Sequence, residues 1–177
     1  MKLLTIVLIC IMSLSACSQV ATPEKIHWMS WNEAIAANKK EPKKIFIDVY
    51  TDWCGWCRKM DASTFRNDVI ANIIKKDYYA VKLNAEMKDT IQFQNHTFIN
   101  PNPAMKRSPH QLAASLLDNR MSYPTFVIMN EKVQRIQILP GYKTAKDFEP
   151  ILRFFGDDTF LTTKYEDFIK TFKHEVQ

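Results

Sequence analysis

Two cysteines separated by two residues are the feature of this sequence with the clearest chemistry. Cys54 and Cys57 follow an apolar, β-rich run at residues 45–50 and precede a segment, residues 58–65, with the pattern of a helix. A helix that begins at Cys54 directs the free N–H groups of its first turn, and the positive end of its dipole, at the Cys54 sulfur. Because the thiolate is the nucleophile, this position predicts that Cys54 reacts at neutral pH. Cys57 lies one turn further on, within reach for a short disulfide.

The other two cysteines belong to the N-terminal segment. One positive charge, an apolar run over residues 3–14 and small residues before Cys17 indicate a secretory signal too short to span a bilayer. The residues Leu-Ser-Ala-Cys at 14–17 also resemble the lipobox of bacterial lipoproteins, which implies cleavage before Cys17 and a lipid on its sulfur. An ordinary cleaved signal is the alternative. Cys10 leaves with the signal, so Cys54 and Cys57 are the thiols expected to remain in a disulfide-permissive compartment.

Length and charge favour a single exported domain. The chain has 177 residues, a formal net charge of +5 and only three glycines, which excludes fibrous and low-complexity classes. We expect a signal at 1–16, a tether at 17–25 and one domain at 26–177, on a membrane-anchored lipoprotein that faces the periplasm. The lysine-rich stretch 39–44 is typical of a solvated turn, with an anionic membrane surface as the alternative partner. Positive charges are otherwise scattered and do not alternate with aromatics, so we expect no nucleic-acid partner.

The periodicity of apolar residues predicts the elements that position the cysteines. Helices are expected over 31–40, 54–65, 69–76, 108–119, 144–155 and 163–174, and strands over 44–50, 78–83, 125–129 and 133–139. Ser30 and Ser108 each begin a capping box, and Asn67 is expected to cap a new helix, so the segment after Cys54 should break near residues 64–65. Gly141 and Gly156 are expected to turn the chain before and after the helix 144–155.

The order of these elements predicts an α/β sandwich. The strands 44–50 and 78–83 form a parallel central pair, an antiparallel hairpin extends the sheet at one edge, and helices cover both faces. Together with a Cys-x-x-Cys after a strand, this order is thioredoxin-like. An inserted stretch, 86–107, contains a small hairpin at 90–99 and follows a strand that ends at the same sheet edge as Cys54. We expect the insertion to wall the site; a loop without function is the alternative.

Five separate places in the sequence resemble the thioredoxin family. The resemblance covers residues 26–156 and consists of the Trp-Cys-Gly-x-Cys motif, an acid six residues before its first cysteine, a strand lysine, a Tyr-Pro-Thr turn and a late glycine: Cys54, Cys57, Asp48, Lys82, Tyr123, Pro124 and Gly141. More narrowly, residues 48–54 followed by 63–65 are similar to the periplasmic C-terminal domain of the transmembrane thiol:disulfide reductase. They also resemble secreted thioredoxin-like lipoproteins of Bacteroidota.

The resemblance implies a division of labour at the site. Cys54 attacks a client disulfide and Cys57 resolves the mixed disulfide. Asp48 is expected beneath the pair, where burial raises its pKa so that it can take and return the proton of Cys57. Lys82 is expected to adjust the pKa of that carboxyl. Plain solvent-facing strand positions are the alternative for both residues.

The same resemblance implies a client-binding surface. Pro124, if its peptide bond is cis, places the backbone of Tyr123 against an extended substrate. Trp53 and Trp56 flank the thiols and offer flat surfaces to a partner peptide. Trp56 stands where thioredoxin has proline, and the tyrosine before Pro124 is a second departure. Both leave the redox direction and the choice of clients open.

Other classes of protein fit the sequence less well. A structural disulfide or a binding module with vestigial cysteines needs none of the residues around the pair. Zinc requires about four ligands, and the histidines follow no ligand spacing. We therefore expect a thiol:disulfide oxidoreductase, most simply a reductase of protein disulfides, without metal or cofactor. Its partners are disulfide-containing client proteins and an electron-donating membrane protein; a disulfide oxidase or isomerase is the runner-up.

Overall fold

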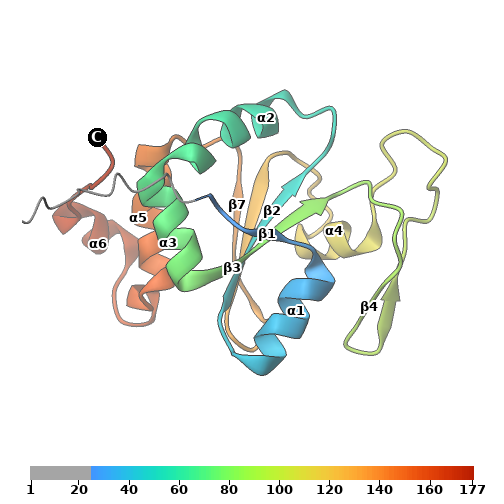
Figure 1. Ribbon diagram of the computed structural model, residues 1–177, viewed down its shortest axis with the longest axis horizontal. Helices are drawn as coiled ribbons and strands as arrows, with labels where there is room; N and C mark the ends of the chain where they lie inside the picture. Colours follow the sequence, from blue (N-terminus) through green and yellow to red (C-terminus); the bar gives the residue numbers. More distant parts are fainter. Residues whose placement is uncertain (1–24) are drawn as a thin grey trace, which may run out of the picture.

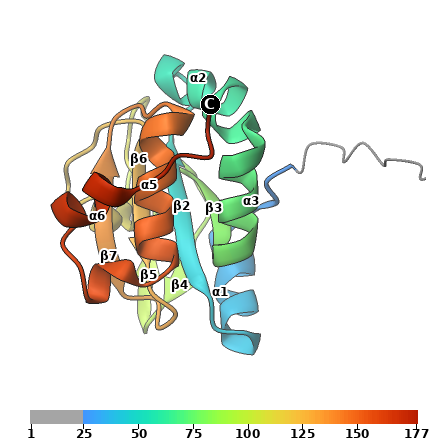
Figure 2. The ribbon, with the colours of Figure 1, turned by 90° about the vertical axis from the view of Figure 1, so that its left-hand side faces the viewer.

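The computed structural model describes residues 25–177. The expected signal, Cys17 and all but the last residue of the expected tether lie outside these residues. A five-stranded sheet has the strand order β1-β3-β2-β6-β7 and carries helices on both faces (Figures 1 and 2). Its strands are β1 (Trp28–Met29), β2 (Lys44–Tyr50), β3 (Tyr78–Asn84), β6 (Thr125–Met129) and β7 (Arg135–Pro140). No helix within the described range is long and apolar enough to cross a membrane.

The register of the sheet confirms the predicted mixed α/β architecture. β2 pairs parallel with β3, and β6 joins the other side of β2 antiparallel, followed by antiparallel β7. All of β2 except Tyr50 is buried, as expected for a central strand. The short strand β1 pairs parallel with β3 and was not predicted. Two residues are too few to show an alternating pattern, so this strand has no recognisable sequence signal.

Alternation along the strands divides the core into two layers. Phe46, Phe126 and Ile128 face helices α2 (Gly55–Ala62), α3 (Asp68–Asp77) and α5 (Ala145–Gly156). Ile45 and Ile47 face helices α1 (Trp31–Lys40) and α4 (Gln111–Leu116) on the other side. Asp48 lies on the same side of β2 as Phe46, beneath the layer that contains α2.

Most of the predicted helix boundaries are confirmed. Ser30 and Glu33 form the capping box of α1, and Asn67 caps α3 after a 3-10 turn, Thr64–Arg66, that breaks the segment following Cys54. The last helix, α6 (Tyr165–Thr171), is shorter than expected and follows a second 3-10 turn, Thr159–Leu161. Gly141 has φ +87°, as its predicted turn requires.

One boundary prediction is wrong. Ser108 does not cap α4, because its hydroxyl donates to Asn100 Oδ1 and its carbonyl accepts from Asn100 Nδ2. His110 caps α4 instead, with Nδ1 accepting from the Leu112 N–H. Gly156 ends α5 as predicted, as its last helical residue. A Cβ there would lie 3.2 Å from atoms of Asp77 and Tyr78, so close packing against α3 and β3 explains this glycine.

The inserted stretch forms the predicted hairpin, β4 (Ile91–Phe93) with β5 (His96–Phe98). The hairpin packs on the α1 side of the domain through Phe93, whose ring meets Trp31 edge-on at 5.2 Å. It lies at the end of the molecule opposite to α2 (Figures 1 and 2). The hairpin therefore does not wall the cysteines. Within the insertion, Glu86 before the hairpin and Arg107 after it contact Trp53, the residue next to Cys54.

Candidate active site

Cys54 and Cys57 form a disulfide at the start of α2, with their Cα atoms 5.3 Å apart. Cys54 is the N-cap residue of the helix, and its sulfur accepts a hydrogen bond from the Cys57 N–H at 3.1 Å. Its own N–H donates to the Thr51 carbonyl, which fixes the turn between β2 and α2. An N–H donor and a helix N-terminus both stabilise a thiolate, so the geometry favours Cys54 as the sulfur that carries negative charge after reduction.

A buried carboxylate lies on the sheet under the helix that carries the disulfide. Asp48 is 1% exposed, and its Oδ2 accepts a hydrogen bond from Lys82 Nζ at 2.6 Å. Lys82 stands directly opposite Asp48 in the parallel register of β2 and β3. Its ammonium group also pairs with Asp61 of α2. Asp48 and Lys82 thus form an internal ion pair, as the resemblance implied, and Asp61 joins them from the helix.

The environment of Asp48 makes its carboxyl hold a proton to a higher pH than an ordinary aspartate does. Burial raises the pKa of Asp48 from 3.8 to about 6, although the charge and hydrogen bond of Lys82 oppose this rise. Within residues 25–177, Oδ1 of Asp48 has no hydrogen-bond partner, so this oxygen is free to hold the proton. Burial acts to lower the pKa of Lys82, but Asp48 and Asp61 together raise it.

A surface pocket connects this ion pair with solvent. The pocket has a volume of about 250 Å³, and its lining includes Asp61 and Lys82. The Lys82 ammonium also lies 5.0 Å from the ring centre of Trp28 and 5.1 Å from that of Tyr50, so aromatic faces hold the cation in place. Asp48 itself is buried and does not line the pocket, and Lys82 joins the two through its bond to Asp48.

The Tyr123–Pro124 peptide bond is cis, as the resemblance implied. Pro124 is buried at the start of β6, and its carbonyl accepts from the Gly141 N–H at 2.8 Å. The Tyr123 ring meets Trp53 edge-on at 5.7 Å. Burial raises the pKa of Tyr123 to about 12, so its phenol stays neutral. The turn before β6 thus contacts the tryptophan next to Cys54.

The two tryptophans around the cysteines are both exposed. Trp53 is 48% exposed and donates from its indole nitrogen to Glu86 at 2.9 Å. Trp56 is 56% exposed and lies against Tyr142, with 5.2 Å between ring centres. The cysteines themselves are buried, so these indoles are the large exposed side chains next to them in the chain.

Sequence reasoning missed several residues that the fold brings to this end of the domain. Asp61, Arg107 and Tyr142 each contact a predicted site residue, and none belongs to a recognisable motif. Only Asp61 could have been found from the sequence, because it lies four residues after Cys57 and therefore on the same face of the helix, above the sheet. His110 is the N-cap of α4 and has no contact with the site. In the part of the chain that the structure describes, no cluster of three or more ligating side chains offers a metal site.

Comparisons with known proteins agree with this geometry. The family model Thioredox_DsbH, described as "Protein of unknown function, DUF255", matches residues 11–109. Human spermatogenesis-associated protein 20 is 31% identical over 75 residues, which cover 42% of this chain and 10% of that protein. An uncharacterized protein of Caenorhabditis elegans, B0495.5, is 31% identical over 67 residues, or 37% of this chain and 9% of its own length. The chain therefore spans about a tenth of these curated relatives.

Solved structures share the fold at low sequence identity. A thioredoxin from Thermus thermophilus has a TM-score of 0.55 at 15% identity, covering 73% of this chain and 85% of its own. A putative disulphide-isomerase from Bacteroides thetaiotaomicron has a TM-score of 0.52 at 19% identity, covering 76% and 95%. By its match over residues 11–109 and its fold, the chain belongs to the Thioredox_DsbH family of the thioredoxin-like superfamily, with a disulfide-oxidoreductase fold and a Cys54–Cys57 pair.

Proposed function

We propose that this chain is a thiol:disulfide oxidoreductase that reduces disulfides in client proteins outside the cytoplasm. The observation that carries the proposal is the Cys54 sulfur, which caps α2, accepts from the Cys57 N–H and is bonded to Cys57. A structural disulfide needs neither this cap nor a buried carboxylate on the sheet below. The ion pair of Asp48 and Lys82 therefore favours a redox-active disulfide over a structural one.

The reaction begins with both cysteines reduced. The Cys54 thiolate attacks one sulfur of a client disulfide, which forms a mixed disulfide and releases the first client thiolate. Cys57 then loses its proton and attacks the Cys54 sulfur, which closes the Cys54–Cys57 disulfide and releases the second client thiolate. Two electrons pass from the protein to the client, the one proton lost by Cys57 goes to the proton acceptor, and the two client thiolates take their protons from solvent. The oxidised protein is the state described here.

Asp48 serves the second step in this proposal. Above about pH 6 its carboxylate is ionised and can accept the proton of Cys57. Lys82 holds the carboxylate through Oδ2, which leaves Oδ1 for the proton. The cation also offsets part of the cost of a buried negative charge, so that Asp48 can ionise near neutral pH.

The proposal includes two kinds of partner. Client proteins carry the disulfides, and a membrane protein that donates electrons returns the Cys54–Cys57 pair to its dithiol form. The reaction itself requires neither metal nor organic cofactor, because the two sulfurs carry the electrons.

The reduction potential of the Cys54–Cys57 pair tests the proposed direction. We expect a value near −230 mV or lower, within the range of reducing members of this fold, together with steady reduction of insulin by the recharged protein. Equilibration with glutathione, followed by mass spectrometry of the alkylated protein, measures the potential. A value above about −180 mV would assign the protein to disulfide oxidation or isomerisation instead. If the reduced protein does not reduce insulin, whatever its potential, the protein is a binding module and not an oxidoreductase.

A lipid anchor on Cys17 is part of the proposal and rests on the sequence at residues 14–17. Cys17→Ala is expected to move the protein from the membrane fraction to the soluble fraction, or to block its processing, because no thiol remains for the lipid. Cell fractionation with mass spectrometry of the mature protein checks this. A variant that stays in the membrane fraction at the wild-type mature mass would contradict the anchor.

A further inference from the structure

Each exposed tryptophan beside the disulfide carries a cation on its ring face and a tyrosine at its side. The Arg107 guanidinium lies 4.8 Å from the ring centre of Trp53, which Tyr123 meets edge-on. The Lys59 ammonium lies 4.9 Å from the ring centre of Trp56 and 5.0 Å from that of Tyr142. These two clusters come from different elements, since Arg107 belongs to the loop after the β4–β5 hairpin and Lys59 to α2. Each cluster lies beside the disulfide, because Trp53 precedes Cys54 in the sequence and Trp56 precedes Cys57.

In the part of the chain that the structure describes, the cations of the two clusters have no anionic partner. Among residues 25–177, neither Arg107 nor Lys59 forms an ion pair with a carboxylate. Both side chains are exposed. A cation held on an aromatic face keeps its charge and most of its hydrogen-bond donors. Arg107 and Lys59 are therefore placed to bind a carboxylate from outside.

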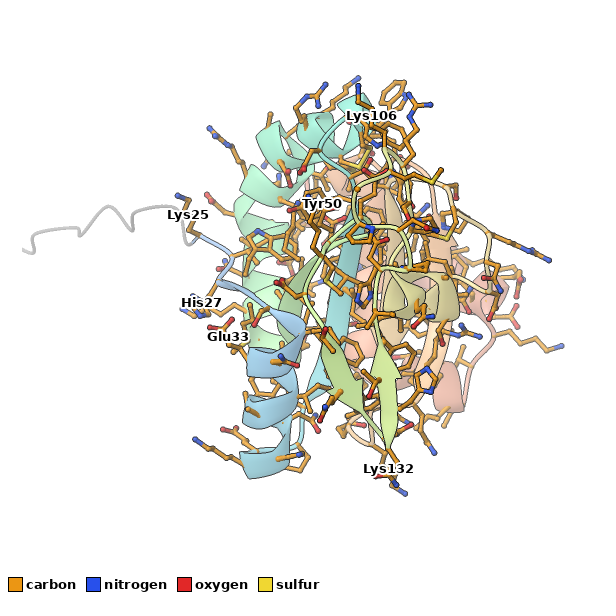
Figure 3. All side chains as sticks on the ribbon, turned by 90° about the vertical axis from the view of Figure 1, so that its right-hand side faces the viewer. Lys25, His27, Glu33, Tyr50, Lys106 and Lys132 are labelled. Atoms are coloured by element: carbon orange, nitrogen blue, oxygen red, sulfur yellow. A yellow bond between two sulfur atoms is a disulfide. The ribbon has the colours of Figure 1, made fainter. Side chains whose placement is uncertain are left out.

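Further charge at this end of the molecule has the same sign. Arg58 donates to the Asp52 carbonyl, and its Nη2 lies 3.9 Å from the position that a Cβ on Gly55 would occupy, beside the first turn of α2. Lys106 lies at the end of the molecule that carries α2, and Lys132 at the opposite end (Figure 3). Neither Arg58 nor Lys106 has an ion pair within the described part of the chain.

The carboxylates near the site already have other partners. Glu86 accepts from the Trp53 indole, Asp52 accepts from Asn84, and Asp61 pairs with Lys82. Glu86 and Asp52 keep their negative charge and offset part of the positive field. They do not contact the cations on the indole faces, so Arg107 and Lys59 keep their unpaired charge on the outer surface.

We propose that these two clusters select clients, and that this protein prefers disulfides flanked by acidic residues. The inference rests on the proposed disulfide exchange and names its substrate class. A peptide that places its disulfide at Cys54 passes over Trp53 and Trp56, which bury its apolar atoms and exclude water. Arg107 on one side and Lys59 on the other then pair with carboxylates on either side of the client cystine.

A set of three model peptides tests the preference. Each peptide contains the same cystine, flanked by glutamates, glutamines or lysines. Single-turnover rates with the reduced protein are divided by the rates of the same peptides with dithiothreitol, which removes their intrinsic reactivity. At about 20 mM salt we expect the glutamate peptide to react about fivefold faster than the glutamine peptide, and the lysine peptide to be slowest. At about 0.5 M salt the ratio should fall below about twofold, because exposed charges are screened.

Variants separate the two clusters from the overall charge of the protein. K59Q/R107Q should lower the glutamate-to-glutamine ratio at low salt to below about twofold, and K59E/R107E should reverse the order so that the lysine peptide is fastest. The control K39Q/K132Q removes the same charge from residues remote from the two clusters and should keep the wild-type ratio. Equal normalised rates for the wild type, or the same fall in the control, would overturn the proposal. Reduction of none of the three peptides would instead contradict the proposed exchange activity.

Discussion

Replacing Cys54 with serine is expected to abolish disulfide exchange, whereas replacing Cys57 with serine is expected to trap clients as mixed disulfides. The structure makes the two sulfurs unequal. Only the Cys54 sulfur caps α2 and accepts a backbone N–H, and both features stabilise its thiolate. Without Cys54 the first attack is lost. Without Cys57 the first attack proceeds, but no sulfur resolves the product.

Non-reducing gels of cell extracts measure this difference directly. Cys57→Ser should give high-molecular-weight bands that disappear with dithiothreitol, and Cys54→Ser should give none. The double variant is the control for nonspecific association. Bands from Cys54→Ser and none from Cys57→Ser would reverse the assignment. Equal bands from both variants would show that the helix cap does not decide which sulfur attacks.

Asp48→Asn is expected to stabilise the fold by about 2–3 kcal/mol at pH 8 and hardly at all at pH 4. Burial raises the pKa of Asp48 from 3.8 in the unfolded chain to about 6 in the folded protein. Between these values the unfolded chain releases a proton that the folded protein keeps, so wild-type stability falls as the pH rises through this window. A shift of about two pKa units corresponds to about 3 kcal/mol. Asparagine cannot ionise and avoids this loss.

Urea unfolding of the oxidised proteins at several pH values checks the effect on stability. The difference between variant and wild type should grow between about pH 4 and pH 6 and then level off. Lys82→Met is the companion variant, because removing the cation leaves Asp48 buried without its partner and raises its pKa further. In that variant the fall in stability with pH should extend above pH 6. A constant difference across this range would show that Asp48 does not titrate as its burial implies.

The same substitution is expected to slow the second step of the reaction. Resolution of a mixed disulfide by Cys57 should rise with pH through about 6 in the wild type, where Asp48 becomes a proton acceptor. In Asp48→Asn this rise should be absent and the rate at pH 7 about tenfold lower. This loss is below the usual 10²–10⁴-fold contribution of a general base, because thiols ionise readily. Alkylation of Cys54 should be nearly unchanged, which separates this role from activation of the first thiol. The same resolution rates for the wild type and Asp48→Asn across pH 5 to 8 would make Asp48 a bystander.

Local interactions explain which parts of the site were predictable. Ser30, Asn67 and Cys54 cap helices through bonds to backbone N–H groups two or three residues away, so short motifs indicate them correctly. The central strand is recognisable because both of its faces are buried, which requires a nearly continuous run of β-branched and aromatic residues. Asp48 and Lys82 meet because two predicted parallel strands bring them into register, and the resemblance implied both the pair and the cis bond before Pro124.

Long-range packing decided the rest. Ser108 has the sequence of a cap but bonds to Asn100, since a tertiary hydrogen bond competed with the local one and won. The hairpin was predicted correctly, yet its direction depends on Phe93 meeting Trp31 across the domain. As a result Arg107 of the return loop contacts Trp53 beside Cys54, and the hairpin itself lies away from this end of the domain.

What the sequence by itself determined is the reactive unit: Cys54 at the start of a helix, Cys57 one turn later, and a buried acid and a lysine on neighbouring strands. Periodicity and capping depend on residues close together in the sequence, and the family resemblance implied the pairing of Asp48 with Lys82, so both can be recognised without the structure. What only the tertiary structure decided is the surroundings of that unit, because Arg107 over Trp53, Tyr142 beside Trp56 and Asp61 on Lys82 depend on the path of loops and the placement of helices. No short motif encodes such contacts. The reactive residues were therefore predictable, and the two tryptophan clusters that we propose select clients were not.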